Sequence, residues 1–137
     1  MLLFVAAAAT AEAAPVKNFD VFAGKVETRG DAHGYGYIKW FDRGRRVTVA
    51  GRINDLCPGD GHSGQVWILA NYSRGYQRVV AYPKDSAGCE GRGKKFKNTS
   101  PSLAAGKITY VRVCVWEVDQ DADPDSRGDQ TCKNYRR

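Results

Sequence analysis

A histidine close to an aspartate and a serine is the arrangement in this sequence that comes nearest to hydrolytic chemistry. His62 lies between Asp60 and Ser63, and these are the side-chain types of a hydrolytic triad. Triad members meet through tertiary geometry, and the chain has no G-x-S-x-G nucleophile elbow. Most Asp and Glu residues lie in predicted loops, which leaves no paired carboxylates on strands. We therefore predict a protein that is not an enzyme and has no catalytic residues.

An acidic segment resembles the start of a calcium-binding loop. Asp119, Asp121 and Asp123 alternate along the chain, as the carboxylates that converge on a hard cation do. The pattern then fails, because the sixth position holds Pro124 instead of glycine and the twelfth holds Gln130 instead of glutamate. We predict a solvated acidic loop, no metal site and no cofactor.

The four cysteines form an even set without a C-x-x-C pair: Cys57, Cys89, Cys114 and Cys132. With two histidines in the whole chain, zinc ligands would be widely scattered. The pattern favours two disulfides. Of the three possible pairings, Cys57–Cys89 and Cys114–Cys132 close the most local loops.

The N-terminal segment predicts export. Residues 1–14 contain an apolar stretch with an alanine run, followed by small residues that resemble a signal-peptidase site. No basic residue precedes Leu2, although a signal peptide normally opens with one, and we therefore expect a truncated or misassigned start. The stretch is shorter than the roughly 20 residues that span a bilayer. We predict a signal peptide over 1–14, no membrane span, and one extracellular domain over 15–137.

Short runs rich in Val, Ile, Tyr, Trp and Thr alternate with Gly, Pro, Asp and Ser clusters, which is typical of antiparallel strands and turns. The sequence predicts an all-β fold, either an antiparallel β-sandwich or a partly open barrel, with seven or eight strands. Hairpin turns are expected at Arg43-Gly44 and Arg74-Gly75. We expect strands over Phe19–Glu27, Tyr35–Phe41, Arg46–Ile53, Gln65–Tyr72, Gln77–Tyr82, Lys94–Lys97, Ile108–Val118 and, in the tail, Thr131–Tyr135.

Alternation assigns faces to two of these strands, because successive strand side chains point to opposite sides. In Arg46–Ile53, the residues expected to face the core are Val47, Val49, Gly51 and Ile53, and those expected to face water are Arg46, Thr48 and Arg52. Both rows of Ile108–Val118 are largely apolar, so this strand is predicted to be buried on both sides. A Cys114–Cys132 bond would then pull the tail across the outer row, over Tyr110 and Trp116.

Charge and aromatic residues indicate a binding surface. The formal net charge is +6, with a basic run over 92–97 opposed to an acidic run over 117–125, and such segregation can steer a charged partner. Aromatic and basic residues interleave over Tyr35–Phe41 and Tyr72–Tyr76, a pattern that can stack sugars or bases, although strands are rich in aromatics for packing alone. The predicted partner-binding residues are Val16, Phe19, Val21, Arg46, Arg52, Arg74, Tyr76 and Lys94.

The first strand offers a connector. It opens with the polar, extended stretch Pro15-Val16-Lys17-Asn18, and residues Val16–Val26 are expected to form an arm that adds to the sheet of another chain, a general mode of recognition. An ordinary edge strand explains the same residues, and both readings stay open.

The chain resembles small secreted two-disulfide β-proteins of actinomycetes. The features that carry the resemblance are the alanine-rich export segment, Gly34–Trp40, the run Val47–Asp55, Cys57–Gly61 and Val111–Cys114. Within that group it looks somewhat like the adaptor subunits of the umbrella-shaped antibacterial toxin particles of Streptomyces. The resemblance implies a protein–protein adaptor without catalysis, and no functional residue is carried over from it.

These observations lead to a ranked expectation about function. We expect a secreted binding or adaptor module for protein partners, with no nucleic acid and with carbohydrate as a possible ligand, as part of an extracellular antibacterial toxin assembly. The alternative is a small antimicrobial or lectin-like effector that binds an envelope, which the basic charge and the arginine–aromatic clusters favour. A secreted hydrolase that uses His62 is the third reading.

Overall fold

A computed structural model describes residues 14–23, 32–55, 62–85, 93–101, 103, 105–119 and 127–137. The described residues form nine strands and one short 3-10 helix, η1. Their bounds are β1 Val16–Phe22, β2 Ala32–Phe41, η1 Asp42–Gly44, β3 Arg46–Asp55, β4 His62–Tyr72, β5 Gln77–Ala81, β6 Lys84–Asp85, β7 Lys94–Thr99, β8 Ile108–Asp119 and β9 Arg127–Tyr135.

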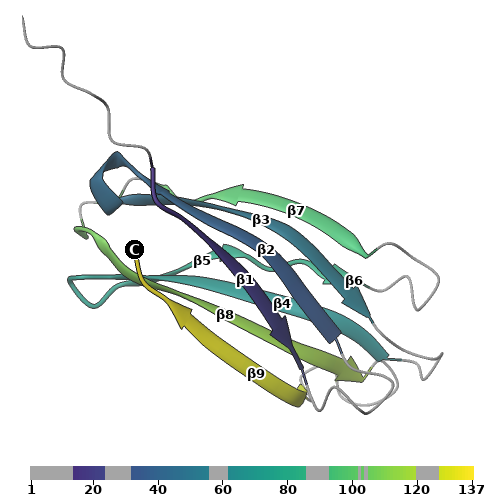
Figure 1. The fold of residues 1–137 in the computed structure, drawn as a ribbon. Helices are drawn as coiled ribbons and strands as arrows, with labels where there is room; N and C mark the ends of the chain where they lie inside the picture. The colour runs from purple at the N-terminus through teal and green to yellow at the C-terminus, as the bar shows by residue number, and fades with distance from the viewer. Residues whose placement is uncertain are drawn as a thin grey trace, which may run out of the picture.

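The strands form two antiparallel sheets packed face to face (Figure 1). The first sheet has the order β1-β2-β3-β7, and the second has the order β5-β4-β8-β9, with β6 paired to β4. One hydrophobic cluster joins the inner faces of both sheets. The prediction of an all-β antiparallel sandwich is confirmed, and the barrel alternative does not apply because the strands divide into two sheets.

Most predicted strands are present, and their bounds shift mainly where glycine or polar residues occur. β2 begins at Ala32 because the glycines of His33-Gly34-Tyr35-Gly36 lie inside the strand and not before it. β6 was not expected, since Lys84-Asp85 carries no apolar alternation; it follows Pro83, whose carbonyl accepts the Val66 N–H. β9 is longer than predicted and begins at Arg127.

Both predicted hairpin turns are confirmed. After β2 the backbone turns through Asp42, Arg43 and Gly44, whose φ angles are 53°, 55° and 85°. Between β4 and β5, Gly75 has a φ of 82° and donates its N–H to the carbonyl of Tyr72. Left-handed backbone of this kind favours glycine, which has no Cβ to clash.

The predicted core rows are confirmed on the inner faces. Val47, Val49 and Ile53 of β3 are fully buried against Val111, Val113 and Val115 of β8 and their neighbours in one cluster. Arg46, Thr48 and Arg52 alternate with the first row and are only partly covered. Strand period thus sets which side chains build the core.

The outer row of β8 is apolar as predicted, but the tail does not cover it in the predicted way. Instead of crossing that row, β9 lies beside β8 in the same sheet, with Cys114 directly opposite Cys132. Trp116 is 3% exposed and is covered by the rings of Trp67 and Tyr82. Pairing at the edge of the sheet gives the backbone N–H and C=O groups of β9 hydrogen-bond partners. A tail that lay across the side chains of β8 would leave those groups without partners from the sheet.

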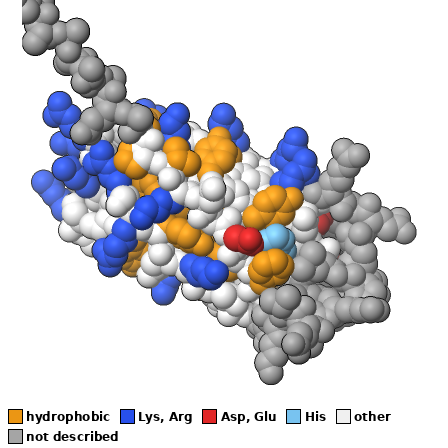
Figure 2. Space-filling view, in the orientation of Figure 1, with side chains coloured by type: hydrophobic (Ala, Val, Ile, Leu, Met, Phe, Trp, Pro, Cys, Tyr) orange, Lys and Arg blue, Asp and Glu red, His pale blue; other side chains and the backbone are white. Residues whose placement is uncertain are grey.

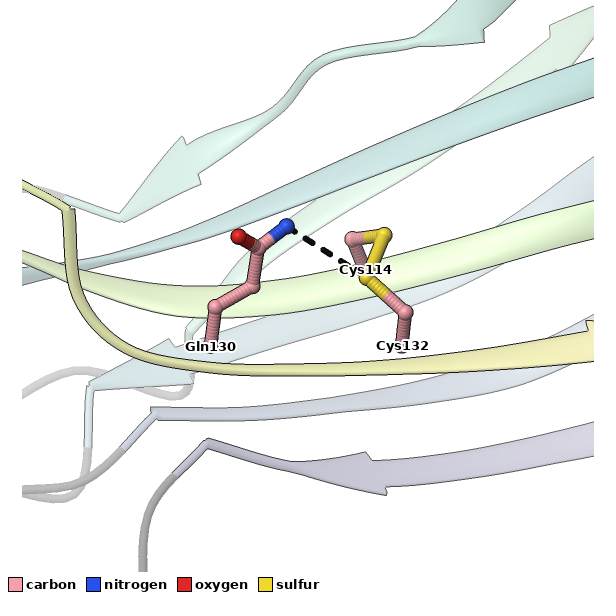
Figure 3. The surroundings of a disulfide bond; sticks show 3 residues. All are labelled: Cys114, Gln130 and Cys132. Carbon is pink, nitrogen blue, oxygen red and sulfur yellow. Dashed lines mark hydrogen bonds between the residues drawn. A yellow bond between two sulfur atoms is a disulfide. The ribbon is translucent and has the colours of Figure 1, made fainter.

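A disulfide joins β8 to β9 at this opposed pair. The Cys114 and Cys132 Cα atoms are 4.1 Å apart, and Gln130 Nε2 lies 3.3 Å from the Cys132 sulfur (Figure 3). The predicted Cys114–Cys132 pairing is confirmed. Cys57 and Cys89, the other predicted pair, lie outside the described residues, as do residues 1–13 of the predicted signal peptide and residues 24–27 of the predicted first strand.

Two glycines bring β2 and β3 into close contact at the centre of the first sheet. Gly36 and Gly51 face each other in register, and they lie in one cross-strand row between Phe19 of β1 and Phe96 of β7. A Cβ on Gly36 would lie 2.0 Å from the Ala50 carbonyl oxygen, and one on Gly51 would lie 2.1 Å from that of Tyr35. These are backbone atoms, so no side-chain rotation relieves the clash.

The space over the glycines is filled by the two phenylalanines. Strands three positions apart are separated by about 14 Å in a flat sheet, yet the ring centroids of Phe19 and Phe96 are 6.4 Å apart and stacked. The rings therefore lean toward each other across the inner side of the glycine pair. This row, Phe19–Gly36–Gly51–Phe96, is called the glycine row below.

Replacing Gly51 with alanine should destabilise the fold by about 2 kcal/mol or more, because the new Cβ must push β2 away from β3. Chemical unfolding of the wild type and the variant measures this difference. Gly75→Ala is the matched control: nothing lies within 4 Å of its Cβ, so only the left-handed backbone is penalised, by about 1 kcal/mol. A Gly51→Ala protein as stable as Gly75→Ala would contradict the close approach.

Removing the Cys114–Cys132 bond should cost about 3 kcal/mol, since it closes a segment with a sequence separation of 18. The double variant Cys114→Ala/Cys132→Ala leaves no unpaired thiol at this position, and urea unfolding measures its free energy. A loss below about 0.5 kcal/mol would show that β9 pairing alone fixes the end of the chain.

Candidate functional site

The outward face of the first sheet carries a hollow lined by aromatic and basic side chains. β2 contributes Tyr35 and Tyr37, β3 contributes Ala50 and Arg52, and β7 contributes Lys95 and Lys97, with the backbone of the glycine row beneath them. The hollow has a volume of about 500 Å³ and opens broadly to solvent. It is called the tyrosine hollow below.

Strand register explains why these side chains meet. Tyr35 is opposite Arg52, which is opposite Lys95, and in the next outward row Tyr37 is opposite Ala50, which is opposite Lys97. Ala50 is the smallest of the six side chains, so it leaves the depression that the others surround. Cross-strand neighbours stand about 5 Å apart, which places two phenols, a guanidinium and two ammonium groups within reach of one ligand.

The electrostatics of the tyrosine hollow favour a negative ligand. Three cationic side chains line it, and the described residues that line it include no carboxylate. The acid on the next strand, Asp20, contacts His33 Nε2 through its Oδ1. Figure 2 views this face and shows the pale-blue histidine against a red acidic side chain, with lysines and arginines in blue around hydrophobic side chains.

His33 belongs to an aromatic stack on the first sheet. The His33 ring lies parallel to Phe22, with centroids 3.9 Å apart, and tilted against Tyr35 at 4.8 Å. The Tyr35 ring thus packs on the His33 ring, which is itself held by Phe22 and by the contact with Asp20. A supported ring loses little conformational freedom when a ligand packs on it.

The predicted binding residues divide between this face and other places. Arg52 lines the tyrosine hollow, and Lys94 is exposed at the start of β7, next to Lys95. Arg46 is half-buried: its guanidinium lies 4.7 Å from the Phe41 ring centroid and its Nε donates to the Ser100 carbonyl at 3.5 Å. Arg46 therefore has a packing role at the end of the sheet.

Arg74 and Tyr76 come together at a different site. They lie at the turn between β4 and β5, where a pocket of about 370 Å³ is lined by Arg74, Tyr76, Arg78, Leu103 and Ala105. The pocket belongs to the second sheet and shares no residue with the tyrosine hollow. Tyr76 is 65% exposed there.

The predicted N-terminal binding arm needs a correction. Phe19 and Val21 are 2% and 0% exposed, so the folded chain cannot offer these core side chains to a partner. Val16 is 54% exposed at the start of β1. The outer edge of β1 is covered near its middle, since Lys133 Nζ donates to the Asp20 carbonyl at 3.1 Å and Tyr135 packs edge-on against Phe19.

Four residues of the tyrosine hollow were not singled out from the sequence: Tyr35, Tyr37, Lys95 and Lys97. Their signals were present, because Tyr35–Phe41 was noted for its aromatic–basic interleaving and Lys95 and Lys97 belong to the basic run. Reading positions i and i+2 together on two separate strands would have grouped them. Ala50 had no signal of its own, since only the register shows that it leaves the depression.

The hydrolytic arrangement receives no support from the described residues. Ser63 is fully buried in β4, so its hydroxyl does not face a substrate. Asp60 and the His62 side chain lie outside the described residues, as does the acidic segment after Asp119. Asp85 is buried, and its Oδ2 accepts a hydrogen bond from the Asp55 backbone N–H at 3.1 Å. This carboxylate therefore has a structural role.

In the part of the chain that the structure describes, no group of three or more His, Cys, Asp or Glu side chains is arranged to hold a metal ion. Within the same ranges, no helix has both the length and the apolar character that crossing a membrane requires.

Comparison with known proteins finds no matching family model, no matching curated protein and no matching solved structure.

Tyr135 gives the closed edge between β9 and β1 a pH dependence. Burial raises the pKa of Tyr135 above its ordinary value of 10.0; the Asp20 charge adds to the rise, and a backbone hydrogen bond at Asp20 opposes it. A raised folded pKa means stability that is fully present below about pH 10 and is lost as the pH rises through the folded pKa.

Between about pH 8 and pH 11, wild-type protein should therefore lose more unfolding free energy than Tyr135→Phe, which cannot ionise at this position. Urea unfolding of both proteins across this range measures the difference, and ionisation of the other tyrosines cancels between them. A constant difference across the range would contradict the assignment.

Proposed function

We propose that this protein is a secreted, non-enzymatic binding module for protein partners, and that its tyrosine hollow holds an acidic segment of one partner. The observation that carries the proposal is the meeting of Tyr35, Tyr37, Arg52, Lys95 and Lys97 around one open depression. Tyrosine and arginine are enriched among the residues that dominate binding energy at protein interfaces.

The shape of the site favours a macromolecular segment over a small substrate. The hollow is broad and open, and it lies on the face of a sheet of four strands. Enzyme substrates usually bind in clefts that enclose most of their surface. An extended or irregular segment of a partner can instead lie across the strands and place its acidic side chains on the rim.

The charge of the hollow supports an acidic segment. Lys95 and Lys97 are exposed, and charge complementarity mainly raises the association rate and excludes wrong partners. The two tyrosines supply rigid apolar area, with hydroxyls for hydrogen bonds. Binding of this kind should weaken as salt concentration rises.

The cross-strand disulfide supports an extracellular role. Disulfides persist in oxidising compartments and are rare in the cytosol, and Cys114–Cys132 pins the last strand to the second sheet. An adaptor in a secreted toxin assembly, the role that the family resemblance implies, fits a small rigid sandwich of this type.

The proposal is tested by purifying C-terminally tagged protein from its native culture medium and identifying what co-purifies by mass spectrometry. Wild type should recover a larger secreted protein in stoichiometric amounts. The variant Lys95→Glu/Lys97→Glu reverses the charge of the tyrosine hollow and should reduce that recovery about tenfold or more, because like charges then face the acidic segment.

The matched control is Lys107→Glu/Arg112→Glu, which changes the net charge equally at two exposed positions, one just before β8 and one within it. It should recover the partner as wild type does. Equal recovery by the Lys95→Glu/Lys97→Glu variant would reject the tyrosine hollow as the site. Recovery of the wild-type chain alone would reject a stable assembly.

A further inference from the structure

A third depression, separate from the tyrosine hollow and from the pocket at the β4–β5 turn, lies on the outward face of the second sheet. It is lined by Trp67, Val79, Tyr82 and Trp116, has a volume of about 280 Å³, and is called the tryptophan cleft below. The four residues come from β4, β5, the segment after β5, and β8. Nothing in the proposed function uses these residues, since the tyrosine hollow belongs to the first sheet.

The rings of the cleft form a floor and walls. Trp116 is 3% exposed and forms the floor, while Val79 and Tyr82 are 50% and 57% exposed. The Trp67 and Trp116 rings are perpendicular with centroids 6.2 Å apart, and the Tyr82 ring lies 5.9 Å from Trp116. Packing therefore fixes the ring orientations, and part of the apolar surface remains open to solvent.

Two amide side chains stand beside the aromatic floor in its cross-strand row, which ends on the β6 side at Lys84, opposite Gln65. In the sheet register Trp116 is opposite Gln65 on β4 and opposite Gln130 on β9. Gln130 is exposed, and its amide lies over the same face as the disulfide (Figure 3). Among the described residues, those that line the cleft carry no charge, in contrast to the three cations of the tyrosine hollow.

We propose that the tryptophan cleft binds one ring of a neutral carbohydrate. A pyranose offers a face of C–H groups that packs on an aromatic ring, and its hydroxyls require donors and acceptors such as an amide provides. The volume lies just below the roughly 300–1,000 Å³ of sites for drug-sized ligands, which suits a single ring. The four described lining residues are uncharged, which favours a neutral sugar over an anionic one.

Size and charge argue against a second copy of this chain as the occupant. A stable protein interface buries about 800 Å² on each partner. Around the cleft, however, the outward face of the second sheet carries the polar residues Asn71, Arg112 and Asn134. The apolar Leu69 is only 8% exposed and adds little surface to this face. The apolar surface is therefore too small to hold two copies together.

Tryptophan fluorescence provides a direct test. The chain has three tryptophans; Trp40 is fully buried in the core, and the other two line the cleft. We use cellohexaose, chitohexaose and maltohexaose as probes. At least one should change the emission saturably, and Tyr82→Ala should weaken that binding about tenfold or more.

Controls separate this site from the rest of the molecule. Tyr76→Ala removes an exposed tyrosine at the β4–β5 turn and should bind sugar as wild type does. Trp67→Phe keeps the fold, since the ring remains aromatic, and should weaken binding in the same direction as Tyr82→Ala. Lys95→Glu/Lys97→Glu should leave sugar binding unchanged. The protein-binding role of the tyrosine hollow and the sugar-binding role of the tryptophan cleft can therefore be rejected independently of each other.

Three results would overturn the inference. One is no emission change with any of the three probes at millimolar concentration. The second is binding that Tyr82→Ala and Trp67→Phe leave unaltered. The third is a sedimentation experiment in which wild type is a dimer and Tyr82→Ala a monomer, because the cleft would then be a self-association surface.

Discussion

The close approach of β2 and β3 at Gly36 and Gly51 is the constraint on which both faces of the first sheet depend. No side chain fits between a glycine Cα and the opposing carbonyl oxygen at these positions. On the inner side, Phe19 and Phe96 lean over the vacant space and complete the core. On the outer side, Tyr35 and Arg52 are held opposite each other next to Ala50, which creates the tyrosine hollow.

The two sheets present different chemistry to solvent from one shared core. The first sheet shows tyrosines with lysine and arginine, and the second shows tryptophans with amides and a disulfide. Because a sandwich buries one face of each sheet, its two outward faces are opposite and can be occupied together. In the proposals made above, one face holds an acidic protein segment and the other a sugar ring, so an adaptor of this kind would link two components.

Strand period explains which parts of this structure were predictable. The inward row Val47, Val49 and Ile53 follows from alternation alone, and the local Cys114–Cys132 pairing follows from cysteine spacing. The position of β9 beside β8 could not be predicted. An apolar outer row indicates that something covers it, but the C-terminal tail and aromatic rings from neighbouring strands would produce the same sequence pattern. The burial of Phe19 was not predicted, because the sequence alone does not show which strand pairs with the first one. Without a known partner strand, the first strand was interpreted as a binding arm.

NMR titration of isotope-labelled protein with the co-purified partner tests the central claim most directly. Amide shifts should concentrate in three short segments that are distant in sequence and adjacent in the first sheet: 35–37, 50–52 and 95–97. Shifts confined to the β4–β5 turn, or to β9 and the edge of β1, would contradict the account, because the partner would then bind a surface that the tyrosine hollow does not include.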